Sequence, residues 1–412
     1  MDLRLTPTPL RGSVTVPASK SMSHRMVIAA ALADGGESTV DNLSLSEDIT
    51  ATLKAVEMLG ASYEMSGGRA VIRGGRSSID APLLDCGESG STLRFLIPIA
   101  LALTGEVSFT GHGRLMERPL DTYFDLFDQK GISHTLENGI LTVKGTLTGG
   151  EFPLSGAVSS QFITGLLFTL PLLKEDSCIV ITDSLSSKAY VAMTLDALKA
   201  FGIQAEQEGW NSFSIPGGQK YQPRNVSVEG DYSQAAFFLE ANFTGSKISL
   251  DGLNPDSLQG DRAAADILVS YKNSGEIIVD ADEIPDLIPA LAAAAAFRTG
   301  EVTRFVNAGR LRVKESDRIA STVAMLHALG AKAESGEDSI TVYGSKALPG
   351  NVSPVNCQND HRIAMAAGAA SCGCENQVTL LGAECVRKSY PRFWDDFRTL
   401  GGQTEQLPER TI

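Results

Sequence analysis

The sequence predicts an α/β protein of repeated βαβαββ units, with buried helices inside each domain and sheets outside. Three observations support this fold class: glycines at a constant spacing, strand-like segments around them, and a second type of helix that is apolar on nearly every side. With 412 residues the chain is too long for one typical hydrophobic core, so we expect two similar domains.

Five glycines each end an amphipathic stretch. Gly60, Gly131 and Gly202 lie 71 residues apart, and Gly330 and Gly401 repeat that interval. A glycine directly after the last apolar position of a helical pattern is a C-terminal cap signal, because glycine adopts positive φ without steric cost. The spacing therefore predicts copies of one structural unit.

Strand-like segments flank the glycine-ended stretches. Residues 104–110 (TGEVSFT) place a turn and β-branched residues before one of them. Residues 132–145 (ISHTLENGILTVKG) predict a hairpin after it, because Asn-Gly suits a two-residue turn. A similar segment at 331–344 follows another glycine-ended stretch.

Six further segments are apolar nearly all round, which predicts buried helices rather than amphipathic ones. They are residues 26–33, 93–103, 162–173, 235–241, 287–297 and 363–370. One such helix in each unit gives six units.

The six units are expected to form two domains of three. We predict the first over residues 14–228 and the second over residues 1–13 together with 229–412. The strand expected at residues 2–6 should pair within the second domain, since the last unit otherwise lacks a closing strand. The fourth unit is the most degenerate.

The composition disfavours several classes of function. A net charge of −14 argues against binding to nucleic acid or to anionic membranes. No apolar run reaches the length of a membrane span, and residues 1–17 lack the apolar core of a signal peptide, so we expect a cytoplasmic protein. The cysteines and histidines form no zinc pattern, so we expect no metal. No exposed apolar helix face demands a partner, so we expect a monomer.

Polar and basic residues gather at the starts of the buried helices. These starts are residues 17–25 (PASKSMSHR), 86–94 (CGESGSTLR), 155–161 (SGAVSSQ), 283–286 (EIPD) and 358–362 (QNDHR). Helix N-termini present free N–H groups and a positive dipole end, so they hold anions. One serine at such a place is most often only a cap, but several basic starts are harder to assign to capping alone.

The loops before three amphipathic helices are basic as well. They are residues 114–119 (RLMERP), 309–318 (GRLRVKESDR) and 385–391 (CVRKSYP). A solvated, ion-paired helix start is the alternative interpretation. Together with the helix starts, these loops predict a site for more than one anionic group.

These segments resemble the 5-enolpyruvylshikimate-3-phosphate synthase family of enolpyruvyl transferases nearly end to end. The shared motifs are ASKSMSHR, ESGSTLR, RLMERP, VSSQF, LSSKAY, IPD, RVKESDR, NDHR and RKSYP. The resemblance implies an inside-out α/β barrel fold, with three βαβαββ units in each of two domains and the active site in the interdomain cleft.

The resemblance also implies two substrates and no cofactor. Residues implied to bind shikimate 3-phosphate are Lys20, Ser21, Arg25, Ser159, Ser160, Gln161, Ser187, Tyr190, Asp286 and Lys314. Those implied for phosphoenolpyruvate are Lys20, Gly90, Arg118, Gln161, Arg318, Arg362 and Lys388. Asp286 would be the base on the attacking 5-hydroxyl. Glu315 would exchange a proton with the enolpyruvyl methylene, and Lys20 is a second candidate for that step.

The sequence departs from the family pattern at three positions. Glu88 stands where many family members have asparagine, and Arg310 where some do. Ala189 replaces a common proline. Gly90 is retained, and in this family a glycine there leaves room for phosphoenolpyruvate and for glyphosate. We therefore expect inhibition by glyphosate.

The sequence argues against three other functions. A sister transferase acting on UDP-N-acetylglucosamine typically carries a cysteine in the loop that reads GHGRLMERP here, where none occurs. A repeat-built DNA clamp needs basic helices around its hole, whereas six helices here are apolar. A binding module without catalysis leaves Asp286 and Glu315 unexplained, although Glu315 has the alternative of an ion pair with Arg318 or Lys314 along its helix.

Overall fold

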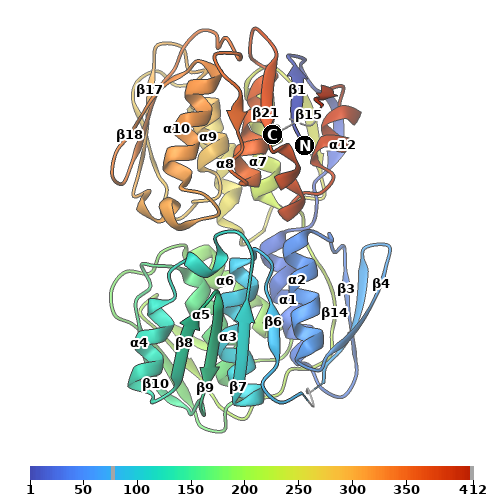
Figure 1. Ribbon diagram of the computed structural model, residues 1–412, viewed down its shortest axis with the longest axis vertical. Helices are drawn as coiled ribbons and strands as arrows, with labels where there is room; N and C mark the ends of the chain where they lie inside the picture. The colour runs from blue at the N-terminus through green and yellow to red at the C-terminus, as the bar shows by residue number, and fades with distance from the viewer. Residues whose placement is uncertain (76–78, 409–412) are drawn as a thin grey trace. The chain divides into compact units, whose positions relative to one another are not determined.

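The computed structural model describes residues 1–75 and 79–408, which fall into two compact units (Figure 1). One unit comprises Ala18–Glu229, and we call it the middle unit. The other joins Met1–Pro17 to the chain from Gly230 onward, and we call it the split unit. The predicted boundaries lie close by, after residues 13 and 228.

The described part of the middle unit forms three four-stranded sheets with one shared topology. In each sheet a parallel strand pair is extended by an antiparallel hairpin. The strand orders are β14 (Asn225–Ser227), β3 (Glu37–Asp41), β5 (Arg69–Arg73), β4 (Ser62–Ser66); β6 (Leu83–Asp85), β7 (Glu106–Thr110), β9 (Ile140–Lys144), β8 (Ser133–Glu137); and β10 (Gly150–Leu154), β11 (Ser177–Ile181), β13 (Ser212–Ile215), β12 (Glu206–Glu208).

Two kinds of helix alternate along the middle unit. The apolar ones are almost wholly buried, namely α1 (Lys20–Leu32), α3 (Gly90–Thr104) and α5 (Ser160–Thr169). The amphipathic ones are α2 (Glu47–Met58), α4 (Asp121–Gln129) and α6 (Lys188–Ala200), which bury one face each. The prediction of buried apolar helices is confirmed here.

The split unit repeats the pattern with one reduced sheet. Its strand orders are β15 (Lys247–Asp251), β2 (Arg11–Thr15); β16 (Ile277–Asp280), β17 (Val302–Val306), β19 (Ile340–Tyr343), β18 (Lys332–Ser335); and β20 (Val355–Asn356), β21 (Val378–Leu381), β1 (Leu3–Thr6), β22 (Gln403–Gln406). The two-stranded sheet belongs to the fourth unit, which the sequence singled out as degenerate.

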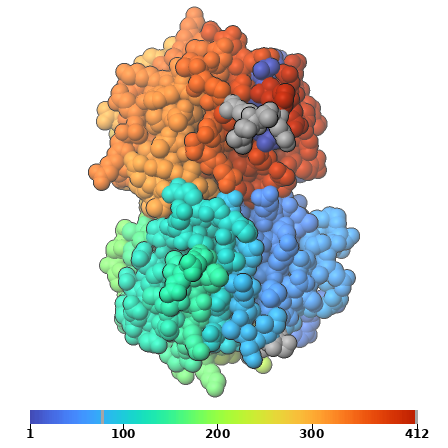
Figure 2. Space-filling view, in the orientation of Figure 1, coloured from blue at the N-terminus to red at the C-terminus, as the bar shows by residue number. Residues whose placement is uncertain are grey.

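The N-terminal strand closes the last sheet of the split unit. β1 pairs antiparallel with both β21 and β22, as expected from the missing strand of the sixth unit. Blue atoms from the start of the chain accordingly lie among red atoms from its end in the space-filling view (Figure 2).

The helices of the split unit also come in two kinds. The buried ones are α7 (Tyr232–Phe243), α9 (Ile288–Ala295) and α11 (His361–Ser371), which pack against one another. The others are α8 (Ala263–Ser270), α10 (Arg318–Leu329) and α12 (Phe393–Thr399). Of the helices in the described ranges, none has the length and hydropathy that a membrane crossing requires.

The spaced glycines end helices as predicted. All five adopt positive φ, between 67° and 105°. Since other residues rarely adopt this conformation, each glycine lets the chain reverse into the following strand. These glycines therefore belong to the scaffold.

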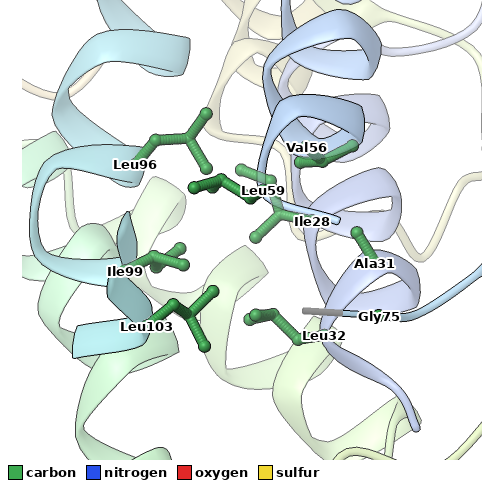
Figure 3. Close-up of a pocket in the computed structure, with 9 residues that line it drawn as sticks. All are labelled: Ile28, Ala31, Leu32, Val56, Leu59, Gly75, Leu96, Ile99 and Leu103. Atoms are coloured by element: carbon green, nitrogen blue, oxygen red, sulfur yellow. The ribbon is translucent and has the colours of Figure 1, made fainter. Parts of the chain in front are cut away.

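A small apolar cavity lies in the middle unit between α1, α2 and α3 (Figure 3). Its lining residues are Ile28, Ala31, Leu32, Val56, Leu59, Gly75, Leu96, Ile99 and Leu103. Their side chains offer no polar group to a charged ligand, so chemistry on anionic substrates must be located elsewhere.

Candidate active site

The start of α1 carries an ammonium group held by a carboxylate. Lys20 is the first residue of α1, after the N-cap Ser19. Its Nζ donates to Asp48 Oδ2 at 2.8 Å, and both side chains are largely buried. Asp48, on the first turn of α2, was not among the predicted site residues. Because no motif links the two positions, the sequence alone gave no signal for it.

Arg25, one turn further along α1, is fixed by α5 and α6. Its guanidinium donates to Thr194 Oγ1 at 2.9 Å and to the Tyr190 carbonyl at 2.8 Å. A longer bond of 3.4 Å reaches Thr164 Oγ1, and the group lies 5.2 Å from the ring centroid of Phe95. Burial lowers the pKa of Arg25 to about 10, so it remains a cation at neutral pH.

The start of α3 is shaped for close approach by an arginine. Gly90 is the first residue of α3, after the N-cap Ser89. A Cβ at position 90 would lie only 2.8 Å from Arg118 Nη1. The missing side chain therefore lets the Arg118 guanidinium rest against a helix N-terminus, where both favour an anion.

The start of α5 joins two serines to a glutamine. Ser159 caps the helix by accepting from the Gln161 N–H at 3.3 Å, and Ser160 follows it. The Gln161 amide accepts from Arg94 Nη1 at 2.8 Å and donates to Ser91 Oγ at 3.0 Å. Arg94 is a functional candidate that sequence reasoning missed. Its signal was a charge inside an apolar run, which needs a partner when buried.

Ser187 stands in a strained backbone conformation at the start of α6. Its φ is 55°, and its side chain is buried. A non-glycine residue with positive φ costs free energy, and such residues cluster at functional sites. Tyr190 lies on the first turn of the same helix.

In the split unit, one carboxylate is held between two arginines. Asp286 Oδ1 accepts from Arg318 Nη1 at 2.7 Å, and Oδ2 accepts from Arg362 Nη2 at 2.7 Å. Arg362 Nη1 also donates to the Asp286 carbonyl at 3.1 Å. Burial raises the pKa of Asp286, but Arg362, Arg318 and Lys314 outweigh it and hold that pKa well below the usual carboxyl range.

Arg318 is shared among three acids. Besides Asp286 it donates to Glu315 Oε2 at 2.6 Å and to Asp360 Oδ2 at 2.8 Å. Its side chain is 1% exposed, and although burial opposes it, the three carboxylates raise its pKa above the usual value. The ion pair between Glu315 and Arg318, left open as an alternative, is therefore present. Asp360, which also caps α11, was not predicted.

Two lysines complete the cations among the predicted site residues of the split unit. Burial, helped by Arg310 and Arg318, lowers the pKa of Lys314 to about 7, against the opposing effect of Asp286 and Glu315. Lys388 is buried and donates to the Asn359 carbonyl at 2.7 Å. Asn359 has a φ of 54°, so this loop is strained as well.

The predicted site residues thus fall into two groups, one in each unit. The middle-unit group is Lys20, Ser21, Arg25, Gly90, Arg118, Ser159, Ser160, Gln161, Ser187 and Tyr190. The split-unit group is Asp286, Lys314, Glu315, Arg318, Arg362 and Lys388.

Comparison with known proteins identifies the family. The model of the EPSP synthase (3-phosphoshikimate 1-carboxyvinyltransferase) family matches residues 5–397. The chain belongs to the EPSP synthase family. The resemblance inferred from the motifs is confirmed.

Curated relatives and solved structures in the EPSP synthase family agree. The 3-phosphoshikimate 1-carboxyvinyltransferase of Clostridium perfringens (strain ATCC 13124) is 43% identical over 418 residues, which cover 97% of this chain and 98% of the relative. That of Clostridium beijerinckii is 45% identical over 427 residues, with the same coverage. An EPSP synthase structure from Acinetobacter baumannii, 27% identical, superposes with a TM-score of 0.79 over 98% of this chain and 100% of that one.

The predicted fold class is confirmed by this structural likeness. Within residues 1–75 and 79–408, no three His, Cys, Asp or Glu side chains are grouped so as to hold a metal ion.

Proposed function

We propose that both groups of residues serve enolpyruvyl transfer. As a member of the EPSP synthase family, the chain transfers the enolpyruvyl group of phosphoenolpyruvate to the 5-hydroxyl of shikimate 3-phosphate. Phosphate is released, and the reaction is a step of the shikimate pathway. The assignment of single residues to single roles is our proposal.

The reaction dictates what the site must supply. The hydroxyl oxygen adds to C2 of phosphoenolpyruvate while C3 gains a proton, giving a tetrahedral intermediate. That intermediate then loses phosphate as a proton leaves the methyl group, which restores the double bond. The balance of atoms needs a base, an acid and fixed positive charge, with no change of oxidation state. We therefore propose that no redox cofactor takes part.

Shikimate 3-phosphate is assigned to the middle-unit group, with help from Asp286 and Lys314. Support comes from the start of α5, where Ser159, Ser160 and the helix N-terminus suit a phosphate. The remaining proposed ligands are Lys20, Ser21, Arg25, Gln161, Ser187 and Tyr190. They offer hydroxyl, amide and cationic groups to the ring and its substituents.

Phosphoenolpyruvate is assigned to cations from both units. Arg118 beside Gly90 supplies a guanidinium at a helix start, and Arg318, Arg362 and Lys388 supply three more cations. Arginine binds phosphate and carboxylate through two parallel hydrogen bonds, which suits both ends of this substrate. Lys20 and Gln161 are proposed as further contacts.

Asp286 is proposed as the base on the 5-hydroxyl, and its arginine partners explain when it becomes basic. With Arg318 and Arg362 on its two oxygens, the carboxylate is a poor proton acceptor. The same two arginines are proposed ligands of phosphoenolpyruvate. An anion that draws them away raises the pKa of Asp286, so the base becomes effective only when the second substrate is bound.

Glu315 and Lys20 are the two proposed proton carriers at C3 of phosphoenolpyruvate. Glu315 Oε2 accepts from Arg318 at 2.6 Å, so the same withdrawal of arginine would release the Glu315 carboxylate. Lys20 Nζ donates to Asp48 Oδ2 at 2.8 Å. Both are consistent with a site in which proton transfer waits for both substrates.

The observation that carries the residue assignment is the carboxylate of Asp286 clamped by two arginines at 2.7 Å. The test is a phosphate-release assay with the purified protein, shikimate 3-phosphate and phosphoenolpyruvate. We expect release only when both substrates are present. Absence of release from the wild-type protein with both substrates would refute the proposed function.

A cytoplasmic monomer is proposed as the working form. Both substrates are multiply charged anions that do not cross a lipid bilayer unaided, which favours action where they are made. Size-exclusion chromatography coupled to light scattering should give one species near the chain mass of 43.6 kDa.

A further inference from the structure

A buried series of polar side chains joins the N-terminal halves of α1, α2 and α3. His24 Nδ1 lies 2.7 Å from Thr52 Oγ1, which lies 2.7 Å from Thr92 Oγ1. Thr92 Oγ1 in turn donates to Ser89 Oγ at 2.7 Å. All four side chains are fully buried. We call these four residues the buried chain.

One end of the buried chain fixes the start of α3. Ser89 is the N-cap of α3 and accepts from the Thr92 backbone N–H at 3.1 Å as well as from its hydroxyl. The next residue is Gly90, against which the Arg118 guanidinium rests. The position of the Gly90 turn therefore depends on Thr92.

The middle of the buried chain fixes the partner of Lys20. Thr52 Oγ1 also lies 3.2 Å from the Asp48 carbonyl, one turn earlier on α2. The Asp48 carboxylate holds Lys20 Nζ at 2.8 Å. A single hydroxyl, that of Thr52, thus connects the residue that orients Lys20 with the residue that orients the Gly90 turn.

We propose that the buried chain positions Lys20 relative to the Gly90 turn and so sets the affinity for phosphoenolpyruvate. The inference rests on the proposed function, in which both of these residues bind that substrate. His24, Thr52 and Thr92 are positioning residues, because they act through Lys20 and Gly90.

The chemistry of the chain suits a positioning role. Hydrogen bonds are directional, and a buried hydroxyl without a partner is costly, so these bonds favour one position of the helices. Within the described residues His24 Nε2 has no hydrogen-bond partner, so the ring is held through Nδ1 and by edge contact with Phe95, at 6.3 Å between centroids. Burial, with Lys20 and Arg25 nearby, keeps the pKa of His24 well below its usual value, so the ring adds no charge that would repel Lys20.

The next residue of α1 belongs to a separate network. Arg25 is bound by Thr194 Oγ1 at 2.9 Å, and Thr194 Oγ1 lies 2.9 Å from Thr164 Oγ1. These bonds join α1 to α5 and α6, which carry proposed ligands of shikimate 3-phosphate. α1 therefore takes part in two networks built from different residues, and each can be cut independently.

The experiment compares Thr52→Val with Thr52→Ser in the phosphate-release assay. Valine keeps the shape of threonine but removes the hydroxyl, while serine keeps the hydroxyl. We expect Thr52→Val to raise the KM for phosphoenolpyruvate by about 10- to 100-fold, the range for a site group displaced by a fraction of an ångström to an ångström. The KM for shikimate 3-phosphate should stay within about twofold, since Arg25 and α5 are held by other bonds.

Two further variants make the test specific. Thr52→Ser should restore the wild-type KM for phosphoenolpyruvate. Thr194→Val, a matched removal of one buried hydroxyl from the other network, should raise the KM for shikimate 3-phosphate and spare that for phosphoenolpyruvate. A purely structural role would instead lower the melting temperature and leave both KM values unchanged.

Each outcome decides between the proposals. An inactive wild type refutes the proposed function itself. An active wild type with an unchanged KM for phosphoenolpyruvate in Thr52→Val, or with both KM values raised equally, overturns the positioning role. If Thr52→Val does not fold, Thr92→Val, which cuts the next link, is measured in the same way. Failure of both to fold would mean that the chain serves stability, and would overturn the proposal too.

Discussion

The two units share one βαβαββ repeat, yet they begin their buried helices with different chemistry. In the middle unit the N-caps of α1, α3 and α5 are serines, Ser19, Ser89 and Ser159. In the split unit α7 and α11 are capped by Asp231 and Asp360. A serine leaves the positive end of the helix dipole available to a ligand, whereas an aspartate neutralises it from within the protein.

This difference in capping residues explains why the two groups of site residues differ in the side chains that they offer to an anion. The middle unit can bind an anion with helix ends and hydroxyl groups, besides the cations Lys20, Arg25 and Arg118. In the split unit carboxylates cap α7 and α11, so we expect its anion binding to depend on Arg318, Arg362 and Lys388. The repeat sets the position of a site residue at the start of a buried helix. The N-cap residue sets the charge at that helix start, which a ligand would contact.

The largest expected effect comes from a substitution in the split unit, where the site residues are mostly charged. Asp286→Asn keeps the shape of the side chain but removes the proton acceptor and the charge between Arg318 and Arg362. We expect kcat to fall by about 10²- to 10⁴-fold, the contribution of general acid–base catalysis. Steady-state phosphate release measures the change.

A control for Asp286→Asn is Glu276→Gln. Glu276 forms an exposed ion pair with Arg304 in the same unit, so its loss should leave kcat within about twofold. Normal turnover in Asp286→Asn would rule out its role as the base, while leaving the family assignment intact.

The next effect tests the helix ends of the middle unit. Gly90→Ala places a Cβ 2.8 Å from Arg118 Nη1, and the flexible guanidinium must move away. We expect the protein to fold normally but its KM for phosphoenolpyruvate to rise about tenfold, in line with the cost of overpacking. Glyphosate, expected to inhibit the wild type, should inhibit this variant less.

Gly131→Ala is the matched control among the scaffold glycines. Gly131 has φ of 67° and no atom within 4 Å of an added Cβ, so alanine there is strained but not crowded. It should cost about 1 kcal/mol of stability and leave both KM values unchanged. Full wild-type turnover at millimolar glyphosate, or an unchanged KM in Gly90→Ala, would contradict the role given to Gly90.

The smallest expected effect is a pH dependence of the affinity for shikimate 3-phosphate, caused by Lys314 in the split unit. With a pKa of about 7, Lys314 is mostly protonated at pH 6 and mostly neutral at pH 8. Binding of shikimate 3-phosphate that depends on this charge should weaken by up to about tenfold over that interval. Titration calorimetry of the binary complex measures it.

Lys314→Arg serves as the control for this pH dependence, because arginine stays charged across the interval. Its affinity for shikimate 3-phosphate should change little between pH 6 and pH 8. Equal slopes for the wild type and Lys314→Arg would show that another group titrates.

Much of the scaffold could be predicted because the same sequence pattern recurs in several units of the chain. The glycine spacing, the apolar helices and the closing role of the strand at residues 2–6 depend on local patterns that recur along the chain. The site motifs at the helix starts were also local. The ion pair of Glu315 was foreseen as an alternative because its partner, Arg318, is three residues away.

What could not be predicted depends on contacts between distant positions. Asp360 meets Arg318 from 42 residues away, and Asp48 meets Lys20 from 28 residues away. Thr52 and Thr92 look like ordinary helix residues in the sequence, and only the packing of α2 against α3 turns them into partners. Arg94 was hidden inside an apolar run for the same reason, since its partner Gln161 lies on another helix.

The pairing of β1 with β21 and β22 has a consequence for biosynthesis. During translation the middle unit is complete once Glu229 has left the ribosome, so it can fold while the rest is still being made. β1 must wait for strands that end at Gln406. Nascent chains should therefore pass through a stage in which one unit is protease-resistant and the N-terminal segment is still cleavable, ending only when the last sheet closes.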